Sequence, residues 1–179
     1  MKIIAFFLTA LLTACSFLDS EKDDHFQEID EMQEELNALE SKLLSNEIDT
    51  LPALQVATNT VELRIKNNLV MDTIDMSLAK KLNAYKVMRR SLGPIGSAFQ
   101  KGKKSIIEQR ETLKNLRKDI ENGSGERDKY RNYIDFEKEK VKKISTLIAD
   151  YVNQKNKTMK TFFDLHSELN TFSLTLIGN

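Results

Sequence analysis

The sequence predicts an all-α protein, an elongated antiparallel bundle of three to four long helices with coiled-coil character. One observation is the composition: 30% of the 179 residues are charged, only two are proline and six are glycine, and tryptophan is absent. This favours long amphipathic helices over sheets or disordered tails. A second observation is that apolar residues recur at helical spacing in successive segments, and a third is that turn-forming residues separate those segments. Together these three observations predict a helical bundle domain at residues 25–179.

The first two helices of this domain are predicted from apolar stripes. The first spans about residues 25–46, with Ile29, Met32, Leu36, Leu39 and Leu43 at steps of three and four residues. Residues 46–52 end it. The second begins near Pro52, a residue tolerated in a first helical turn, and runs to about Leu92. Its stripe, interrupted only by Lys81, consists of Met71, Ile74, Leu78, Tyr85, Met88 and Leu92.

The strongest predicted break in the domain is the sequence Gly-Pro-Ile-Gly at residues 93–96, which combines the backbone freedom of glycine with the missing donor of proline. A third helix then runs to about Glu121. Its seam contains Phe99, Ile106, Leu113, Leu116 and Ile120, but also Gly102 and Gln109. We therefore expect its first half to be weakly packed or close to a neighbouring backbone. The next break is the run Asn-Gly-Ser-Gly at residues 122–125.

The fourth helix carries the clearest periodicity in the chain. Residues 126–177 contain neither glycine nor proline, and one heptad register continues through fourteen seam positions: Tyr130, Ile134, Glu137, Val141, Ile144, Ile148, Tyr151, Lys155, Thr158, Phe162, Leu165, Leu169, Phe172 and Leu176. Eleven of these are apolar, which predicts a long helix of the coiled-coil type. The adjacent exceptions Lys155 and Thr158 mark a weak point.

The last part of this helix is predicted to extend beyond its neighbours. If the third helix descends from a turn at residues 93–96, the returning fourth helix is level with that turn near Val152, and roughly 36 Å of helix remains. This overhang holds Phe162, Leu165, Leu169, Phe172 and Leu176. Either the chain bends near residues 155–158 and folds back, or the segment is an interface for a protein partner or a second copy of the chain.

The N-terminus has the pattern of an export signal. Met1 and Lys2 precede an uncharged apolar stretch at residues 3–14, which ends at Cys15, the only cysteine of the chain. Twelve residues reach only ~18 Å as a helix, against a hydrocarbon core of about 30 Å. The stretch is therefore predicted to be a cleaved signal peptide, residues 1–14, and not a transmembrane anchor.

The four residues Leu12-Thr13-Ala14-Cys15 resemble the lipobox of bacterial lipoproteins. The resemblance covers only the first fifteen residues. It implies that Cys15 receives diacylglycerol before cleavage and carries two or three acyl chains, such as palmitate, which suffice for durable membrane anchoring. Residues 15–24 would then form a lipid-anchored tether. Ser16 after the cysteine implies the outer membrane, if the cell is Gram-negative.

Charge is segregated along the chain although the formal net charge is zero. Residues 15–50 hold twelve acidic and two basic side chains, whereas residues 51–179 hold fifteen acidic and twenty-four basic ones. Residues 76–107 contain no acidic residue. The eight cations in that stretch form a predicted basic collar around residues 93–96: Lys80, Lys81, Lys86, Arg89, Arg90, Lys101, Lys103 and Lys104. The collar either docks the acidic first helix, is solvated, or attracts an anionic envelope component.

The residue patterns that catalysis requires are missing. The two histidines, His25 and His166, belong to no His-Glu-x-x-His pair, and no phosphate-binding loop or Gly-x-Ser-x-Gly elbow is present. A Glu-x-x-His spacing is also missing, because Phe163 lies three residues before His166. We therefore expect no enzyme, no metal and no cofactor. Nucleic acid is not an expected partner, because the basic residues are not interleaved with aromatic stacking platforms.

The sequence thus predicts a membrane-anchored bacterial envelope lipoprotein. Its body is expected to serve as a non-enzymatic helical scaffold or adaptor that recognises a protein through a helix face. The alternative is a binding module for an anionic envelope glycan or lipid, acting through the basic collar. Salt separates the two, because binding to the collar weakens steeply with ionic strength and apolar recognition does not.

Overall fold

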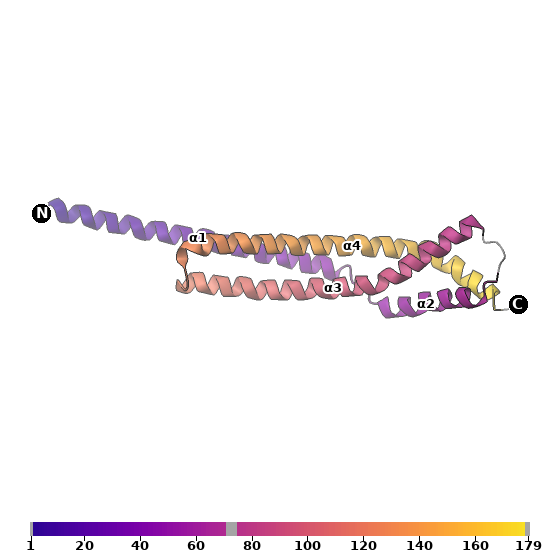
Figure 1. The fold of residues 1–179 in the computed structure, drawn as a ribbon. Helices are drawn as coiled ribbons and strands as arrows, with labels where there is room; N and C mark the ends of the chain where they lie inside the picture. The colour runs from indigo at the N-terminus through magenta and orange to yellow at the C-terminus, as the bar shows by residue number, and fades with distance from the viewer. Residues whose placement is uncertain (1, 71–74, 178–179) are drawn as a thin grey trace. The chain divides into compact units, whose positions relative to one another are not determined.

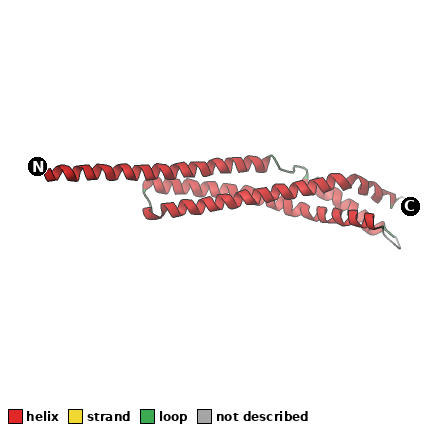
Figure 2. Ribbon diagram, turned by 90° about the horizontal axis from the view of Figure 1, so that it is seen from above, coloured by secondary structure: helices red, strands yellow, loops and turns green. Residues whose placement is uncertain are grey.

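The fold is all-α, as predicted. In the computed structural model the backbone is described for residues 2–70 and 75–177, and side chains for residues 21–70 and 75–177. Over these residues the α-helices are α1 (Lys2–Leu44), α2 (Leu51–Asn68), α3 (Met76–Asn122) and α4 (Tyr130–Thr175), with a short 3-10 helix at Arg127–Lys129 (Figure 1). The described residues contain no strand (Figure 2).

The chain divides into two compact units. Unit 1 consists of Met1–Lys42 and Lys103–Thr146, and unit 2 of Leu43–Gly102 and Leu147–Asn179. In unit 1 the buried apolar side chains come from α1, the second half of α3 and the first half of α4; Leu36, Leu113 and Ile134 are fully buried. In unit 2 they come from α2, the first half of α3 and the second half of α4. The long helices α3 and α4 pack together and contribute to both units.

The predicted break at residues 93–96 does not exist. Helix α3 continues through Pro94, which is exposed, as is Gly93. The physical reason is that the apolar stripe continues on both sides: Leu92, Ile95 and Phe99 are buried at helical spacing. Burying each such side chain contributes roughly 1.5–3 kcal/mol, and together they offset the ~3 kcal/mol that proline costs inside a helix. The prediction gave too much weight to the proline and glycines at residues 93–96 and did not include Ile95 in the seam.

The real interruption lies earlier, so the predicted second helix is two helices. Helix α2 begins at Leu51 with Pro52 in its first turn, as predicted, but it ends at Asn68. Helix α3 begins at Met76, where the Asp75 side-chain carboxylate accepts hydrogen bonds from the backbone amides of Ser77 (2.9 Å) and Leu78 (3.1 Å). This is N-capping, which satisfies donors that a helix start leaves free. The predicted seam residues Met71 and Ile74 lie outside the described residues.

The turn between α3 and α4 is formed as predicted, by two glycines. Gly123 and Gly125 have φ angles of +63° and +80°, in the left-handed region that glycine tolerates best. The amide of Ser124 donates to the carbonyl oxygen of Asp119 (2.8 Å), closing the end of α3 in a Schellman-type cap. The Tyr130 hydroxyl donates to the carbonyl oxygen of Ser124 (2.6 Å), which ties the start of α4 to the same turn.

The heptad register predicted for α4 is confirmed, because all fourteen seam positions are buried or half-buried. The three polar exceptions each have a partner. The Gln109 amide donates to the Glu137 carboxylate (2.6 Å), and the Lys155 ammonium donates to the Asn46 side-chain oxygen (3.0 Å). The hydroxyls of Thr158 and Ser91 are 2.8 Å apart. Lys155 and Thr158 are therefore paired positions inside a continuous helix, and the chain does not bend back there.

Candidate functional site

Cys15, the predicted lipidation site, lies within the backbone span of α1, but its side chain is outside the described residues. Helix α1 begins at Lys2, so its backbone includes the predicted signal peptide and tether. The division of residues 1–24 into these two parts, and the lipid on Cys15, stay predictions. Within the described residues no helix is both long and apolar enough to cross a membrane.

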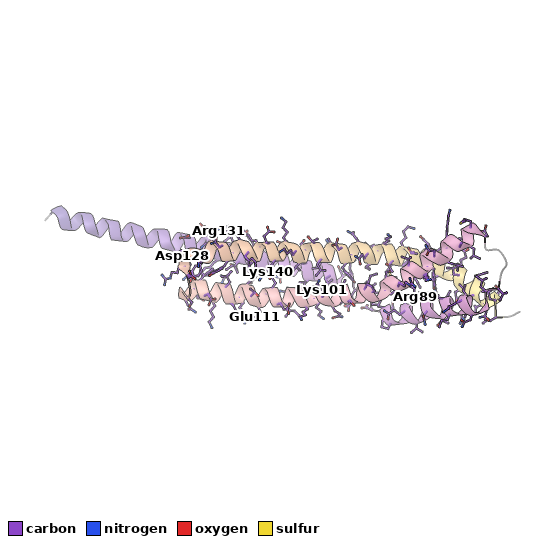
Figure 3. All side chains as sticks on the ribbon, viewed as in Figure 1. Arg89, Lys101, Glu111, Asp128, Arg131 and Lys140 are labelled. Atoms are coloured by element: carbon purple, nitrogen blue, oxygen red, sulfur yellow. The ribbon has the colours of Figure 1, made fainter. Side chains whose placement is uncertain are left out.

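The eight cations of the basic collar all lie on α3, but they do not surround a turn, because α3 continues through residues 93–96. Three of them are engaged in ion pairs: Lys81 with Glu168 (2.5 Å), Arg89 with Glu62, and Lys104 with Glu108 of the same helix (3.6 Å). The other five are exposed and form no ion pair with any described side chain: Lys80, Lys86, Arg90, Lys101 and Lys103. Figure 3 labels Lys101, one of these five, and Arg89, one of the paired cations.

The acidic first helix is partly neutralised by cations outside the collar. Arg110 of α3 pairs with Glu40 (2.8 Å), and Arg117 pairs with Asp30. Glu28 is paired with Arg131 (2.5 Å) and Lys138 of α4. Burial by itself would raise the pKa of Glu28, but hydrogen bonds from Lys138 and Arg131 hold it below its usual value. The hypothesis of charge neutralisation is thus correct for α1, with partners that the sequence did not identify.

The predicted overhang is wrong, because helices of the same chain cover it. Leu169 is fully buried in a cluster with Val61 and Ile65 of α2 and with Tyr85 of α3. The other four residues of the predicted interface pack half-buried against this cluster: Phe162, Leu165, Phe172 and Leu176. The reason is the break between α2 and α3, which lets both helices flank the end of α4. These five residues are core of unit 2.

His166 belongs to this same core region. The Tyr85 hydroxyl lies 2.6 Å from the His166 Nδ1, and the Phe162 ring is stacked on the imidazole with centroids 4.5 Å apart. Burial lowers the pKa of His166 and raises that of Tyr85. A neutral imidazole can accept a hydrogen bond from the tyrosine hydroxyl at Nδ1, and a protonated one can donate to the hydroxyl oxygen instead. Burial favours the neutral histidine, and its contacts with Tyr85 and Phe162 give it a structural role.

We expect the stability of unit 2 to fall as the pH drops below about 6.5, the ordinary pKa of histidine. Because the folded-state pKa of His166 is lowered, the unfolded chain binds its proton first, and stability is complete only above that pH. Melting temperatures between pH 7.5 and about 5.5 measure this. The variant His166→Phe keeps an aromatic ring beside Phe162 and should show a smaller fall; an equal fall in both proteins contradicts the assignment.

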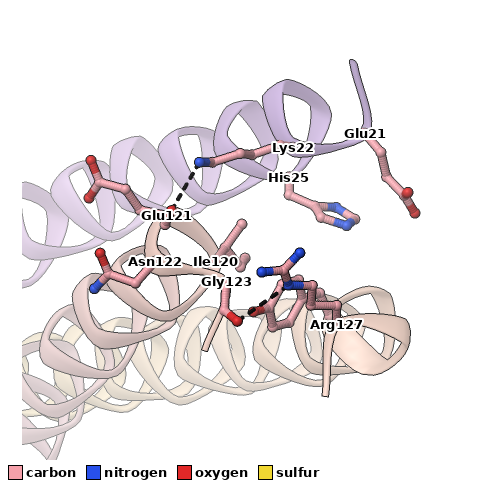
Figure 4. Close-up of a pocket in the computed structure, with 9 residues that line it drawn as sticks. Glu21, Lys22, His25, Ile120, Glu121, Asn122, Gly123 and Arg127 are labelled. Atoms are coloured by element: carbon pink, nitrogen blue, oxygen red, sulfur yellow. Dashed lines mark hydrogen bonds between the residues drawn. The ribbon is translucent and has the colours of Figure 1, made fainter. Parts of the chain in front are cut away.

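A pocket of about 250 Å³ lies in unit 1, between α1 and the turn that joins α3 to α4 (Figure 4). The Lys22 ammonium donates to the carbonyl oxygen of Glu121 (3.0 Å), and the Arg127 guanidinium donates to that of Gly123 (3.3 Å). His25 is 5% exposed, and its Nδ1 has no hydrogen-bond partner. Glu21 and Glu121 also line the pocket, so two carboxylates offset its two cations.

Sequence reasoning assigned no role to this pocket, and its residues carry no recognisable motif. The lining offers hydrogen-bonding groups of both charges and no paired nucleophile and base among its described residues. No group of three or more potential metal-ligating side chains occurs in the part of the chain that the structure describes. No known protein family, no curated protein and no solved structure matches this chain.

Proposed function

We propose that this protein is a lipid-anchored scaffold or adaptor of the bacterial envelope, whose helical body binds a protein partner through an apolar helix face. The lipobox-like ending of the apolar segment at Cys15 supports the anchor. The observation that carries the binding function is the uneven distribution of exposed apolar side chains. Of the twelve large hydrophobic residues exposed among those described, nine belong to unit 2.

Helix α2 offers the best defined apolar face. Val56 and Leu63 are 68% and 46% exposed, and seven residues separate them, so they lie two helical turns apart on one side. The opposite side of α2 is used in the core, where Thr58, Val61 and Ile65 are buried. A helix with a buried stripe and a second, exposed apolar stripe fits recognition of another helix or an apolar groove.

A second candidate is binding of an anionic envelope glycan or lipid through the basic collar. Five of its cations are exposed without an ion pair among the described residues, whereas the acidic helix α1 pairs with cations elsewhere. Unpaired surface cations raise the local concentration of a polyanion, an effect that salt screens beyond about 8 Å at physiological strength.

The test is capture of partners from bacterial membranes by the tagged full chain, at about 0.05 M and 0.5 M salt. Replacement of Val56 and Leu63 by glutamate should remove a protein partner that wild type retains at both salt concentrations. The matched control replaces Gln55 and Asn68, exposed on the same helix but outside this face, by glutamate; it adds the same charge and should retain the partner.

Three outcomes contradict the leading proposal: no protein is captured, the apolar variant captures it as well as wild type does, or the control loses it too. If the material retained is instead a glycan or lipid, released by salt and lost on replacing Lys80 and Lys86 by glutamate, the second candidate is correct. Helix content and melting temperature are measured for each variant to test that the body is folded. Both should stay close to the wild-type values, because exposed side chains contribute little to stability.

A further inference from the structure

The outer face of α1 in unit 1 is acidic and unpaired. Of the carboxylates on the described part of this helix, Glu28, Asp30 and Glu40 form ion pairs with α3 and α4. Six others are exposed and form no ion pair with any described side chain: Glu21, and the five that make up the outer face, Asp23, Asp24, Glu31, Glu34 and Glu35. At 3.6 residues per turn these five fall within an arc of about 120°, turned away from the buried stripe.

The outer face of α3 in unit 2 is basic and equally unpaired. Lys80, Lys86, Arg90 and Lys101 are exposed, have no ion pair among the described side chains, and fall within an arc of about 120°. The buried residue Leu92 lies on the opposite side of the helix. The two other unit 2 cations of the collar, Lys81 and Arg89, are held by Glu168 and Glu62 and do not belong to this face.

Each face has like charges at neighbouring helix positions, Glu31 with Glu34 and Glu35 and Lys86 with Arg90, and this repulsion costs free energy that an opposite face would recover. Residues 23–35 cover roughly 18 Å of helix and residues 80–101 roughly 32 Å, so the acidic face fits within the length of the basic face. Opposite charge on two facing surfaces is the pattern by which interfaces select partners and steer association. The acidic face of this chain therefore complements its own basic face, and each molecule carries one of each.

We propose that this protein associates with further copies of itself, the acidic face of α1 in one molecule lying on the basic face of α3 in the next. The two faces differ, so the contact is heterologous, and a molecule engaged through one face keeps the other free for a third copy. Anchoring on a common membrane would raise the effective concentration of the faces. The association does not depend on the lipid or on the apolar face proposed above, and it gives the collar a protein ligand instead of an envelope polymer.

The experiment measures the mass of the full chain in neutral detergent by sedimentation equilibrium, over a range of concentrations. Wild type should grow in mass with concentration at about 0.05 M salt and return to monomer at about 0.5 M. The acid-reversed variant carries Glu31→Lys, Glu34→Lys and Glu35→Lys. The base-reversed variant carries Lys86→Glu, Arg90→Glu and Lys101→Glu. Each should stay monomeric at low salt, because its two faces then have the same sign.

The decisive test is whether association is restored when both charge reversals are present. An equimolar mixture of the two variants, and a single chain carrying all six substitutions, should associate as wild type does. The control Lys118→Glu, Lys142→Glu and Lys143→Glu changes the charge by the same amount at exposed positions of unit 1 outside both faces, and should still associate. Circular dichroism confirms that all variants are folded, which is expected because every substituted residue is exposed.

The proposal is overturned if wild type is monomeric at low salt, if the control also loses association, or if the mixture fails to restore it. It is overturned as well if the base-reversed variant alone loses association, because α1 is then not the partner of the basic face. Vesicles containing an anionic lipid test whether the basic face binds membrane lipid instead of a second copy of the chain. If base reversal abolishes vesicle binding but leaves the mass unchanged, the basic face binds membrane lipid and not a second copy.

Discussion

Replacing Leu169 with aspartate should unfold unit 2, with a loss of roughly 4 kcal/mol or more. Leu169 is fully buried between α2 and α3. Removing its side chain forfeits about 1.5–3 kcal/mol of burial, and a carboxylate in that apolar cluster carries a further desolvation cost of about 1–3 kcal/mol or more. Thermal unfolding followed by circular dichroism should show a large decrease in melting temperature, or a separate early transition for this part of the chain.

The matched control is Phe163→Asp, which places the same carboxylate on the same helix at a side chain that is 72% exposed. It should change the melting temperature little, because an exposed charge is solvated. If Leu169→Asp instead left stability intact and removed an oligomer or a partner, the segment would be an interface, one of the two alternatives that the heptad pattern left open. A similar loss in both variants would show that the burial of Leu169 is not what stabilises this region.

Replacing Cys15 with serine should abolish incorporation of a fatty-acid probe and leave the chain as an uncleaved or soluble precursor. The thiol is the acceptor of the diacylglycerol in the proposed lipoprotein, and serine cannot take its place as the acylated nucleophile. Cys15 is the only cysteine, so no second acceptor thiol exists in the chain. Metabolic labelling followed by membrane fractionation measures both effects, each expected to be nearly complete.

The helical body should be unaffected by this substitution, since the first buried residue in the described part of the chain is His25, ten residues after Cys15. Ser16→Ala serves as the control and should still be labelled and membrane-bound. Equal labelling of wild type and Cys15→Ser would refute the lipoprotein assignment. Such a result would leave the proposed contact between copies standing, because that contact involves side chains at residues 23–35 and 80–101 and not the lipid.

Periodicity predicted the helices well wherever a seam was long. The register of α4 was correct over all fourteen positions, and the stripe of α1 from Ile29 to Leu43 is buried as expected. Both stripes are regular over several turns, so the signal accumulates. The glycine turn after Asn122 was also predictable, because two glycines there take positive φ angles that other residues avoid.

Two breaks were misjudged for opposite reasons. At residues 93–96 a proline with two glycines looked decisive, yet Leu92, Ile95 and Phe99 continue the buried stripe and the helix persists. Residues 69–75, between α2 and α3, contain neither glycine nor proline, and the break was missed. The signal available there was Asp75, whose carboxylate caps α3. Moving the break changed which residues cover the end of α4, and with it the interpretation of Phe162 and its neighbours as an interface.

The sequence by itself determined that this chain is helical and which apolar stripes face a core. It also showed that charge is segregated along the chain, and that an apolar segment at the N-terminus ends at the only cysteine. These are local properties, readable from the period and composition of the chain. Only the tertiary structure decided which cations neutralise α1 and which stay unpaired. Arg110, Arg117 and Arg131 reach α1, whereas Lys86, Arg90 and Lys101 do not. Charge pairing depends on distance in space across helices far apart in the sequence, and no periodicity encodes that distance.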